Sequence, residues 1–378
     1  MKNLDKSSNF IEEIDDSSSE IREPFDPTKI DITAKPLIID SLVKRMKSKP
    51  MRIDLNTEFQ RKGNLWKDEY QSRLIESLLV KIPLPAFYFD GSDDTIWKII
   101  DGLQRICTLK NFIIDKTLKL TNLEYLKQYE GKGFEDLPPF LQGRIEETHI
   151  TAYIINPGTP HEVKYNIFKR INTGGLVLTP QEIRHALNQG IPADFVKELA
   201  ESQEFHTATD YVLNNSKRME DRDFVTRFIG FYNGYETYQP DLDSYLNREM
   251  KRLGRVTAEE RQRIKTDFIK AMKAAVKIFN NDAFRKRYDF NVSRNPINKA
   301  LFETWSVNLA NQPDYNIDIL IANKKKVKKN FIQMMNTDKD FDKSITSATG
   351  DLKAVQRRFS KIADLIKEVL NDIPNQID

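Results

Sequence analysis

The sequence predicts an α+β protein, in which a small mixed sheet with helices is followed by a mainly α-helical domain. Three observations support this prediction. Short alternating or apolar segments typical of strands occur only in the first half of the chain. Pro and Gly clusters interrupt that half repeatedly. Beyond Gly190 the apolar residues recur at helical spacing, with little strand signal.

The first half predicts strands and helices in alternation. Apolar residues predict a helix over 37–46, and residues 51–55 then alternate like a strand. Trp66, Tyr70, Leu74 and Leu78 are spaced four apart, which predicts a helix that ends before Pro83. Further along, residues 86–89 and 95–100 flank a polar turn and predict a hairpin, and residues 150–155 predict another strand.

The later helices are predicted mainly from their capping residues. Thr179 with Glu182, and Thr257 with Glu260, have the spacing of a capping box at a helix start. Apolar residues from Leu352 to Val369 describe a terminal amphipathic helix. We therefore expect a domain at 29–190 and a helical domain at 191–378, after a disordered acidic tail at 1–28 that is rich in Ser, Asp and Glu.

Composition limits the class of protein. The chain has 59 Lys and Arg residues against 56 Asp and Glu residues, a net charge of +3, so any nucleic-acid site has to be local. One cysteine, Cys107, excludes an intrachain disulfide and fits a reducing compartment. No apolar run approaches the roughly 18 residues that a membrane span needs, and no secretory leader is evident. We expect a cytoplasmic protein.

Residues 101–105, Asp-Gly-Leu-Gln-Arg, lie where a predicted strand runs into a predicted helix. Unpaired N–H groups at a helix start attract phosphate, Gly102 allows close approach, and Arg105 offers a bidentate fork. The same segment also reads as a simple capping box, with Asp101 and Gln104 three residues apart. Either a phosphate site or a helix cap therefore explains it.

Two further segments carry similar chemistry. Gln60 and Arg61 lie in a predicted loop, and Arg170 and Asn172 end a predicted helix at a Gly-Gly turn. Each could be a surface charge or a helix cap. Together with residues 101–105 they predict one phosphate pocket.

These segments, in this order, resemble the N-terminal domain of GmrSD-type restriction endonucleases, which belongs to the ParB and sulfiredoxin-like superfamily. The resemblance is carried by residues 58–66, by 100–105 with Thr108, and by 168–175 with Thr179 and Glu182. It spans about 36–190. Single-module members of this family also resemble the second half at 222–231, 283–286 and 298–303.

The resemblance implies a ParB-like domain that binds a nucleoside triphosphate, in proteins that restrict foreign or modified DNA. Hydrolysis stays open, because the family's Asp-Gly-Gln-Gln-Arg motif has Leu103 at its third position here, and leucine has no hydrogen-bonding group. The residues that we expect at the nucleotide, with or without Mg²⁺, are Asp101, Gln104 and Arg105 as candidate catalytic residues and Gln60, Arg61, Gly102, Arg170 and Asn172 as phosphate-binding residues.

Other catalytic sites are not predicted. The four histidines have no paired ligand spacing, so we do not expect a self-contained His-type metal nuclease. No Walker loop, dinucleotide fingerprint or Gly-x-Ser-x-Gly elbow is present. Cys107 is expected to be a buried core thiol.

Two basic stretches could contact the DNA backbone, or could be solvated helix faces. The candidate nucleic-acid-binding residues are Arg252, Arg255, Arg285, Lys286, Lys325 and Lys326. The leading hypothesis is a nucleotide- and DNA-associated protein of a restriction-type defence system, with defence partner proteins. The alternatives are a non-catalytic module that docks on DNA or a partner, and a nuclease activity in the ParB-like domain.

Overall fold

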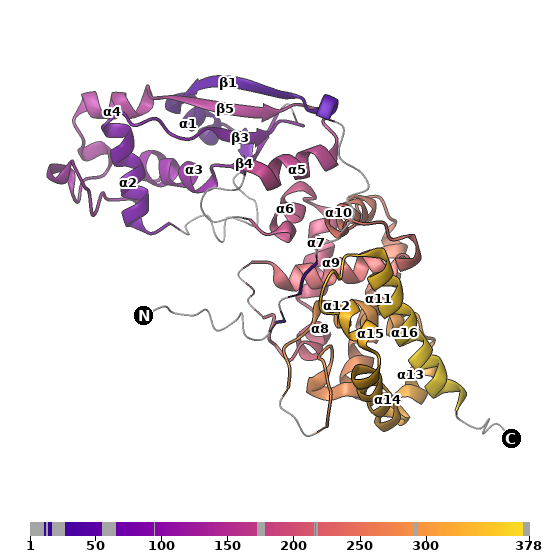
Figure 1. Cartoon of the computed structure of the whole chain (residues 1–378). Coiled ribbons are helices and arrows are strands. Elements are labelled where there is room, and N and C mark those ends of the chain that lie inside the picture. Colours follow the sequence, from indigo (N-terminus) through magenta and orange to yellow (C-terminus); the bar gives the residue numbers. More distant parts are fainter. Residues whose placement is uncertain are drawn as a thin grey trace. The chain divides into compact units, whose positions relative to one another are not determined.

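The computed structural model describes residues 11, 12, 14–16, 27–54, 66–93, 95–171, 178–214, 216, 218–290 and 294–372 (Figure 1). The chain forms two compact units. The sheet unit is Phe25–Val177, and the helical unit combines Met1–Pro24 with Leu178–Asp378. The sheet unit is thus inserted into the sequence of the helical unit.

This division differs from the boundaries expected at 28 and 190. Helix α6 (Pro180–Leu187) belongs to the helical unit because its polar side chains are bonded there. Gln181 Nε2 donates to Thr226 Oγ1 at 3.0 Å, and Arg184 Nη2 to Asp223 Oδ1 at 3.0 Å. The expected disordered tail at 1–28 contains ordered residues, since residues 11, 12, 15 and 16 contact the helical unit.

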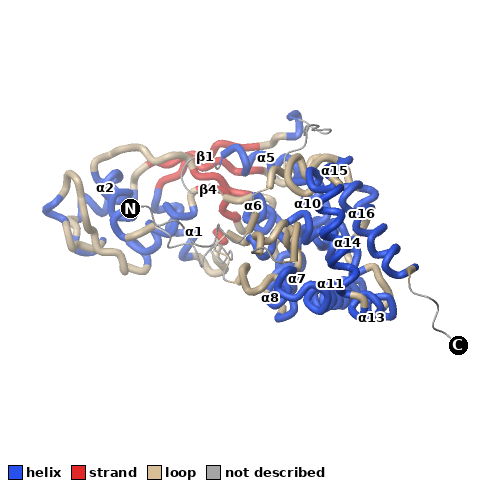
Figure 2. The backbone as a smooth tube through the Cα atoms, turned by 60° about the horizontal axis from the view of Figure 1, so that its bottom comes forward, coloured by secondary structure: helices blue, strands red, loops and turns tan. Residues whose placement is uncertain are grey.

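The sheet unit contains one mixed five-stranded sheet of order β1-β5-β3-β4-β2 (Figure 2). β1 pairs antiparallel with β5, and β3 antiparallel with β4, whereas β5–β3 and β2–β4 are parallel. The strands are β1 (Ile32–Ile38), β2 (Ile53–Asp54), β3 (Phe87–Asp90), β4 (Trp97–Asp101) and β5 (His149–Ile155). The mixed sheet confirms the predicted fold class.

Side-chain alternation places helices on the two faces of this sheet. Phe87 and Phe89 of β3 are fully buried in one core together with residues of four helices, while Asp90 points to the opposite face and bonds Lys164 of α5. The four core helices are α1 (Ile39–Lys47), α2 (Asp68–Leu79), α3 (Leu103–Leu109) and α4 (Pro139–Glu146). α5 is His161–Ile171, and the π-helical turn η3 (Lys110–Ile114) continues α3. Short 3₁₀ turns are η1 (Pro27–Lys29), η4 (Lys127–Tyr129) and η5 (Phe134–Asp136).

The predicted hairpin, the strand at 150–155 and the helix before Pro83 are confirmed, but the helix expected from Leu37 begins at Ile39. Residues 32–38 instead form β1, which pairs only with β5 at the edge of the sheet. Its central residues, including Lys35 and Pro36, are exposed. Edge strands tolerate proline and lose the apolar alternation that would reveal them in a sequence.

The helical unit contains, in its described part, helices only besides short turns and isolated bridges. Its helices after α6 are α7 (Ile191–Ala200), α8 (Gln203–Ala208), α9 (Glu220–Tyr232), α10 (Leu242–Leu253), α11 (Ala258–Phe279), α12 (Lys299–Ala310), α13 (Asp314–Ala322), α14 (Lys324–Thr337), α15 (Lys339–Ser344) and α16 (Leu352–Asn371), with 3₁₀ turns η6 (Tyr235–Thr237) and η7 (Asn280–Asp282). α11 and α16 match the predicted long helices. In both predicted capping boxes the threonine hydroxyl accepts the expected backbone N–H: Thr179 accepts from Glu182, and Thr257 accepts from Glu260.

α12 lies at the centre of this unit and is buried on all sides. Phe302 contacts the rings of Phe205, Phe224 and Phe284 at centroid distances of 4.8–5.9 Å. A helix buried all round has no solvated face for its polar residues, so Glu303 of α12 has to find partners inside the core.

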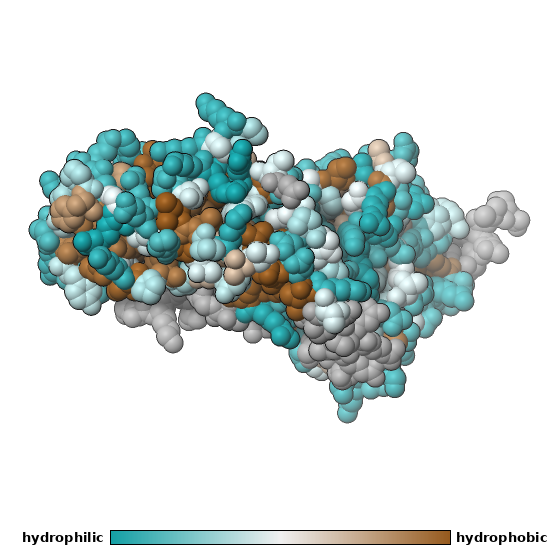
Figure 3. All heavy atoms as spheres, turned by 90° about the horizontal axis from the view of Figure 1, so that it is seen from above, coloured by the Kyte–Doolittle hydropathy of each residue, from teal (hydrophilic) through white to brown (hydrophobic). Residues whose placement is uncertain are grey.

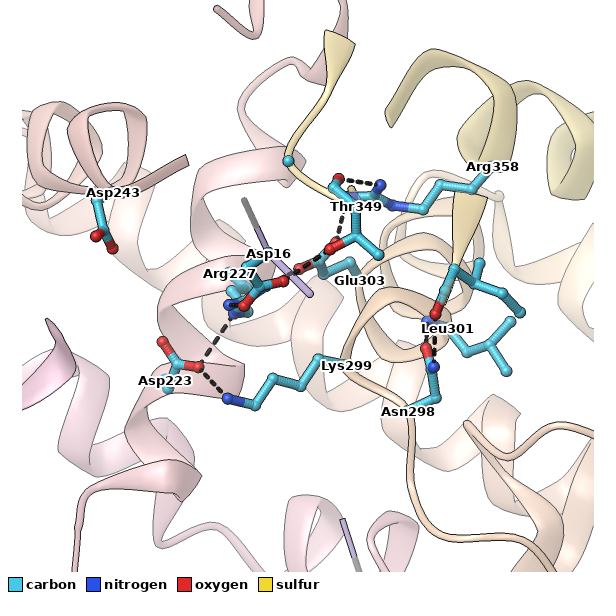
Figure 4. A network of polar contacts seen from close by, with 12 residues as sticks. Asp16, Asp223, Arg227, Asp243, Asn298, Lys299, Leu301, Glu303, Thr349 and Arg358 are labelled. Carbon is cyan, nitrogen blue, oxygen red and sulfur yellow. Dashed lines mark hydrogen bonds and ion pairs between the residues drawn. The ribbon is translucent and has the colours of Figure 1, made fainter. Parts of the chain in front are cut away.

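A network of buried charges supplies these partners (Figure 4). Glu303 accepts from Arg227 Nη1 at 2.6 Å and from Arg358 Nη2 at 2.7 Å, and both arginines are at least 95% buried. Arg227 Nε also donates to Asp223, whose carboxylate accepts hydrogen bonds from Lys299 and Arg184 as well. The network therefore links α6, α9, α12 and α16.

The charges in this network stabilise one another's ionised forms. Burial alone would raise the pKa of Asp223, but Arg227, Lys299 and Arg184 outweigh it and hold this pKa well below the ordinary value. Burial would lower the pKa of Arg227, but Asp16, Asp223 and Glu303 raise it well above the ordinary value. Removing one member would leave an uncompensated buried charge.

No helix among the described residues is long and apolar enough to cross a membrane. On the face drawn in Figure 3, hydrophilic residues surround separate groups of hydrophobic residues.

In the sheet unit, Glu76 of α2 organises the loop at 124–126. Its carboxylate accepts three backbone N–H groups, from Glu124 at 2.9 Å, Tyr125 at 2.7 Å and Leu126 at 2.8 Å. Burial alone would raise the pKa of Glu76, but these donors outweigh it and lower the pKa.

We predict that Glu76→Gln lowers the free energy of unfolding at pH 7 by about 1–3 kcal/mol, because a neutral amide accepts these bonds less well. A carboxyl whose pKa is lower in the folded state stabilises the fold at any pH above its unfolded-state pKa. This stabilisation is lost as the pH falls through the folded-state pKa. Urea unfolding should therefore show a wild-type-to-variant difference that shrinks on acidification. Glu124→Gln, which removes a half-exposed carboxylate paired with Arg73, is the matched control and should change stability little. A difference independent of pH would contradict the role of the charge.

Candidate functional site

The strand-to-helix junction predicted at residues 101–105 is present in the sheet unit. β4 ends at Asp101, Gly102 has φ +100° and α3 begins at Leu103. A Cβ on Gly102 would lie 2.5 Å from Cδ1 of Phe87. Both the left-handed backbone and the approach of Phe87 therefore require glycine at this position.

Arg105 points into the protein from this junction. Its Nη1 donates to the carbonyl of Pro85, and its Nη2 donates to the carbonyl of Ala86 at 3.1 Å and to Asp101 Oδ2 at 2.7 Å. The guanidinium lies 4.4 Å from the ring centroid of Phe87. Burial lowers the pKa of Arg105, and Asp101 opposes this shift. Arg105 thus ties α3 to the start of β3.

Gln104 connects the junction to the predicted Gln-Arg loop. Its Oε1 accepts from the backbone N–H of Trp66 at 3.3 Å, and Gln71 Nε2 donates to the carbonyl of Trp66 at 2.9 Å. Trp66 is the first described residue after position 54, so Gln60 and Arg61 lie outside the described residues. The carboxy-terminal end of that loop is nevertheless fixed at Gln104.

The remaining residues of the predicted pocket lie at the end of α5. Arg170 is exposed in the last turn of this helix, whereas Asn172 lies outside the described residues. α5 packs on β4, the strand that ends at Asp101. Leu103, at the position where the resembling family has glutamine, packs against the core of the sheet unit.

The sheet face beside Asp101 also carries residues that the sequence patterns did not single out. Tyr88 pairs with Asp101 between β3 and β4, and its ring stacks on Tyr153 with a centroid distance of 4.9 Å. Burial, with the nearby Tyr153 and Asp101, raises the pKa of Tyr88. Alternation in β3 and β5 places both tyrosines on the face opposite to Phe87. Their pairing could have been predicted only from the register of the two strands.

A buried ion pair lies further along the same face. Lys164 Nζ contacts Asp90 Oδ1 at 3.0 Å and Oδ2 at 3.2 Å, and both side chains are nearly buried. The signal in the sequence is a lysine directly beside the apolar positions Val163 and Ile167 of a helix. This pair fixes α5 to β3.

The basic residues predicted for DNA contact divide into two groups. Arg285 is buried and donates to the carbonyls of Asn281 at 3.1 Å and Asn295 at 2.7 Å. Lys286 is buried against Glu12 at 2.7 Å and Thr346 at 2.6 Å. These two side chains stabilise the helical unit and do not face solvent.

The other four basic candidates lie nearer the surface. Arg252 bonds Glu249 and Glu260, each at 3.0 Å, and Lys326 bonds Asp372 at 2.6 Å. Arg255 and Lys325 are exposed. Carboxylates thus already neutralise half of this set.

Metal-ligand and thiol chemistry adds no further site. No group of three or more His, Cys, Asp or Glu side chains able to hold a metal ion is present within the described ranges. His185 is buried and contacts Arg222 at 3.4 Å. Cys107 is buried as predicted, and burial raises its pKa to about 11, so it is a poor nucleophile at neutral pH.

Part of the chain matches a known family model. Residues 39–189, about two-fifths of the chain, match the model of the GmrSD restriction endonuclease, N-terminal domain. The match contains the Gly102 junction, α5 and the capping box of α6. No curated protein and no solved structure matches the chain.

We predict that Arg105→Ala lowers the free energy of unfolding by about 1–3 kcal/mol, because it leaves Asp101 and the carbonyls of Pro85 and Ala86 without their donor. Thermal unfolding followed by circular dichroism measures this loss. Arg170→Ala, which removes an exposed arginine from the same unit, is the control and should leave the melting temperature nearly unchanged. Equal stability of the two variants would refute the structural role of Arg105.

Proposed function

We propose, from the GmrSD-type N-terminal domain that residues 39–189 form, that this chain is a component of a restriction-type defence system against foreign DNA. In this proposal the sheet unit binds a nucleoside triphosphate with Mg²⁺ at the Asp101 junction. The helical unit contacts DNA or a partner protein. The proposal assigns binding and no catalytic step, because Leu103 packs against the core and offers no hydrogen bond.

The hydrogen bond between Gln104 and Trp66 is the observation that carries the nucleotide proposal. It fixes Trp66, the first described residue after the segment with Gln60 and Arg61, at the start of α3. Backbone N–H groups at a helix start and a nearby arginine suit a phosphate group. We therefore infer that Gln60 and Arg61 act on the same anion as the junction.

The residues have distinct proposed roles. Asp101, whose side chain is 29% exposed, supplies a carboxylate oxygen to Mg²⁺, a hard cation that usually keeps several waters. Arg61 and Arg170 neutralise phosphate charge, with Gln60 and Asn172 as hydrogen-bonding groups. Gly102 allows close approach of the backbone, and Arg105 orients Asp101 through their 2.7 Å contact. Tyr88, which pairs with Asp101 between β3 and β4, stacks on Tyr153.

The bonds of Arg105 favour a second candidate function, a non-catalytic docking module. Among the described residues, its guanidinium donates to the carbonyls of Pro85 and Ala86 and to Asp101, all of the sheet unit. The Gln-Arg motif would then only build the fold, and the unit would dock on DNA or on a partner protein. This candidate predicts no nucleotide binding.

We predict saturable, Mg²⁺-dependent binding of at least one ribonucleoside triphosphate by the full chain in isothermal titration calorimetry. Arg170→Ala should weaken this binding about ten-fold or more, the equivalent of about 1.4 kcal/mol. Arg73→Ala, a half-exposed arginine of α2 in the same unit, is the matched control and should stay within about two-fold of wild type. Absence of binding for all four ribonucleotides, with and without Mg²⁺, would leave the docking module as the function.

Exposed cations on α14 and after α10 support DNA contact by the helical unit. We predict that the double variant Arg255→Ala with Lys325→Ala binds plasmid fragments more weakly, and that the slope of log K against log salt concentration falls by about 2. Fluorescence anisotropy across a salt series measures this slope. Lys127→Ala with Lys132→Ala removes two exposed lysines from the sheet unit and should leave the slope unchanged. An unchanged slope in the first variant would exclude these two residues from the DNA surface.

A further inference from the structure

The described residues near the N-terminus, 11, 12 and 14–16, lie against the helical unit, and we call them the N-terminal strap. The residues that they contact, among them Arg227, Lys286 and Ile297, form what we call the strap site. Ile11 forms a parallel bridge with Ile297, and the N–H of Glu12 donates to the carbonyl of Ile297 at 2.8 Å. Ile297 forms an antiparallel bridge with Arg285 on its other side. The strap thus adds an extended segment to an existing pair, as in peptide recognition by strand addition.

The other end of the strap pairs with the segment before α16. The N–H of Thr349 donates to the carbonyl of Asp15 at 2.9 Å, and the N–H of Asp15 donates to Thr346 at 3.4 Å. The backbone of the strap is therefore held at both ends.

Carboxylates of the strap contact cations that the helical unit has buried. Glu12 Oε1 lies 2.7 Å from Lys286 Nζ, and Glu12 Oε2 accepts from Asn298 Nδ2 at 3.0 Å. Asp16 pairs with Arg227 and accepts from Thr349 Oγ1 at 2.7 Å (Figure 4). Side chains of Arg227 and Lys286 are only 5% and 8% exposed, whereas those of Asp16 and Glu12 are 32% and 21% exposed. The buried cations belong to the helical unit, and the partly exposed carboxylates belong to the strap.

Asp16 adds a negative charge to the buried network. Among the described residues bonded in this network, which Figure 4 shows in part, the cations are Arg184, Arg227, Lys299 and Arg358, and the helical unit itself supplies the anions Asp223, Asp243 and Glu303. Asp16 is the anion that the strap contributes. A buried cation that loses a counter-charge is destabilised, so an anion at the position of Asp16 stabilises this site.

Few apolar contacts hold the strap. Ile11 and Ile14 are only partly buried against the helical core. Its other contacts are hydrogen bonds and ion pairs, each with a net contribution of about 1–3 kcal/mol. Because the strap belongs to the same chain as its binding site, its binding is intramolecular, and even a modest intrinsic affinity keeps such a segment in place. Contacts of this kind are also open to exchange with a competing segment.

We propose that the strap site binds an acidic, extended peptide, and that the N-terminal strap is its resident occupant in cis. The peptide that it takes has two carboxylates four positions apart, at the positions of Glu12 and Asp16, placed for Lys286 and Arg227. It also has apolar residues at the positions of Ile11 and Ile14. Recognition combines strand addition at Ile297 with charge pairing.

The test uses the full chain and a fluorescein-labelled peptide with the sequence of residues 9–18. We expect the chain carrying Glu12→Gln and Asp16→Asn to bind this peptide saturably in fluorescence anisotropy. Wild type should bind at least ten-fold more weakly, because its own strap competes. Higher salt should weaken the binding. An unlabelled peptide with Glu12→Gln and Asp16→Asn should not compete.

Glu147→Gln with Asp318→Asn removes two exposed carboxylates elsewhere and should behave as wild type. If the first double variant unfolds, Glu12→Gln alone tests the same exchange, because Asp16 then still balances Arg227. Three results would overturn the proposal: no saturable binding by the folded variant up to about 1 mM peptide, equal binding by wild type, or equal competition by the neutral peptide.

Discussion

The ion pairs that Glu303 makes with Arg227 and Arg358 are the interaction on which the helical unit depends. Glu303 is fully buried in the central helix α12, and its two arginines come from α9 and α16. A buried charge pair is often no more stabilising than a hydrophobic contact of the same volume, but it requires a well-defined geometry. The pairs therefore fix how α9 and α16 pack on α12, while the aromatic contacts of Phe302 supply the apolar burial.

In the sheet unit, one short motif has both a structural and a proposed binding role. Arg105 turns inward to the start of β3, Gln104 turns outward to Trp66, and Gly102 makes room for Phe87. A motif that is recognised in a sequence as chemistry can thus first serve the architecture. In this protein the arginine holds the carboxylate of Asp101, and the proposed ligand would meet that carboxylate and the loop.

Local patterns in the sequence were sufficient for most elements of the fold. The β3–β4 hairpin, the capping boxes at Thr179 and Thr257, and the junction at Gly102 all depend on residues close together in the chain. The edge strand β1, the inward direction of Arg105, and the roles of Arg285 and Lys286 depend on contacts with distant residues. For the same reason composition predicted a disordered tail, although Glu12 and Asp16 neutralise cations more than 200 residues away. Of the expected pocket, Gln60, Arg61 and Asn172 lie outside the described residues.

Insertion of the sheet unit between the strap and the helices has a consequence for synthesis of the chain. Asp15 and Thr349 are 334 positions apart in the sequence. At about 5–20 residues per second, a ribosome needs roughly 17–70 s to make the second partner after the first. The sheet unit, whose residues are contiguous at 25–177, can complete its own folding in that interval. The acidic segment at the beginning of the chain is thus among the last parts to find its place, and until then the cations that it neutralises are open to other anions in the cell.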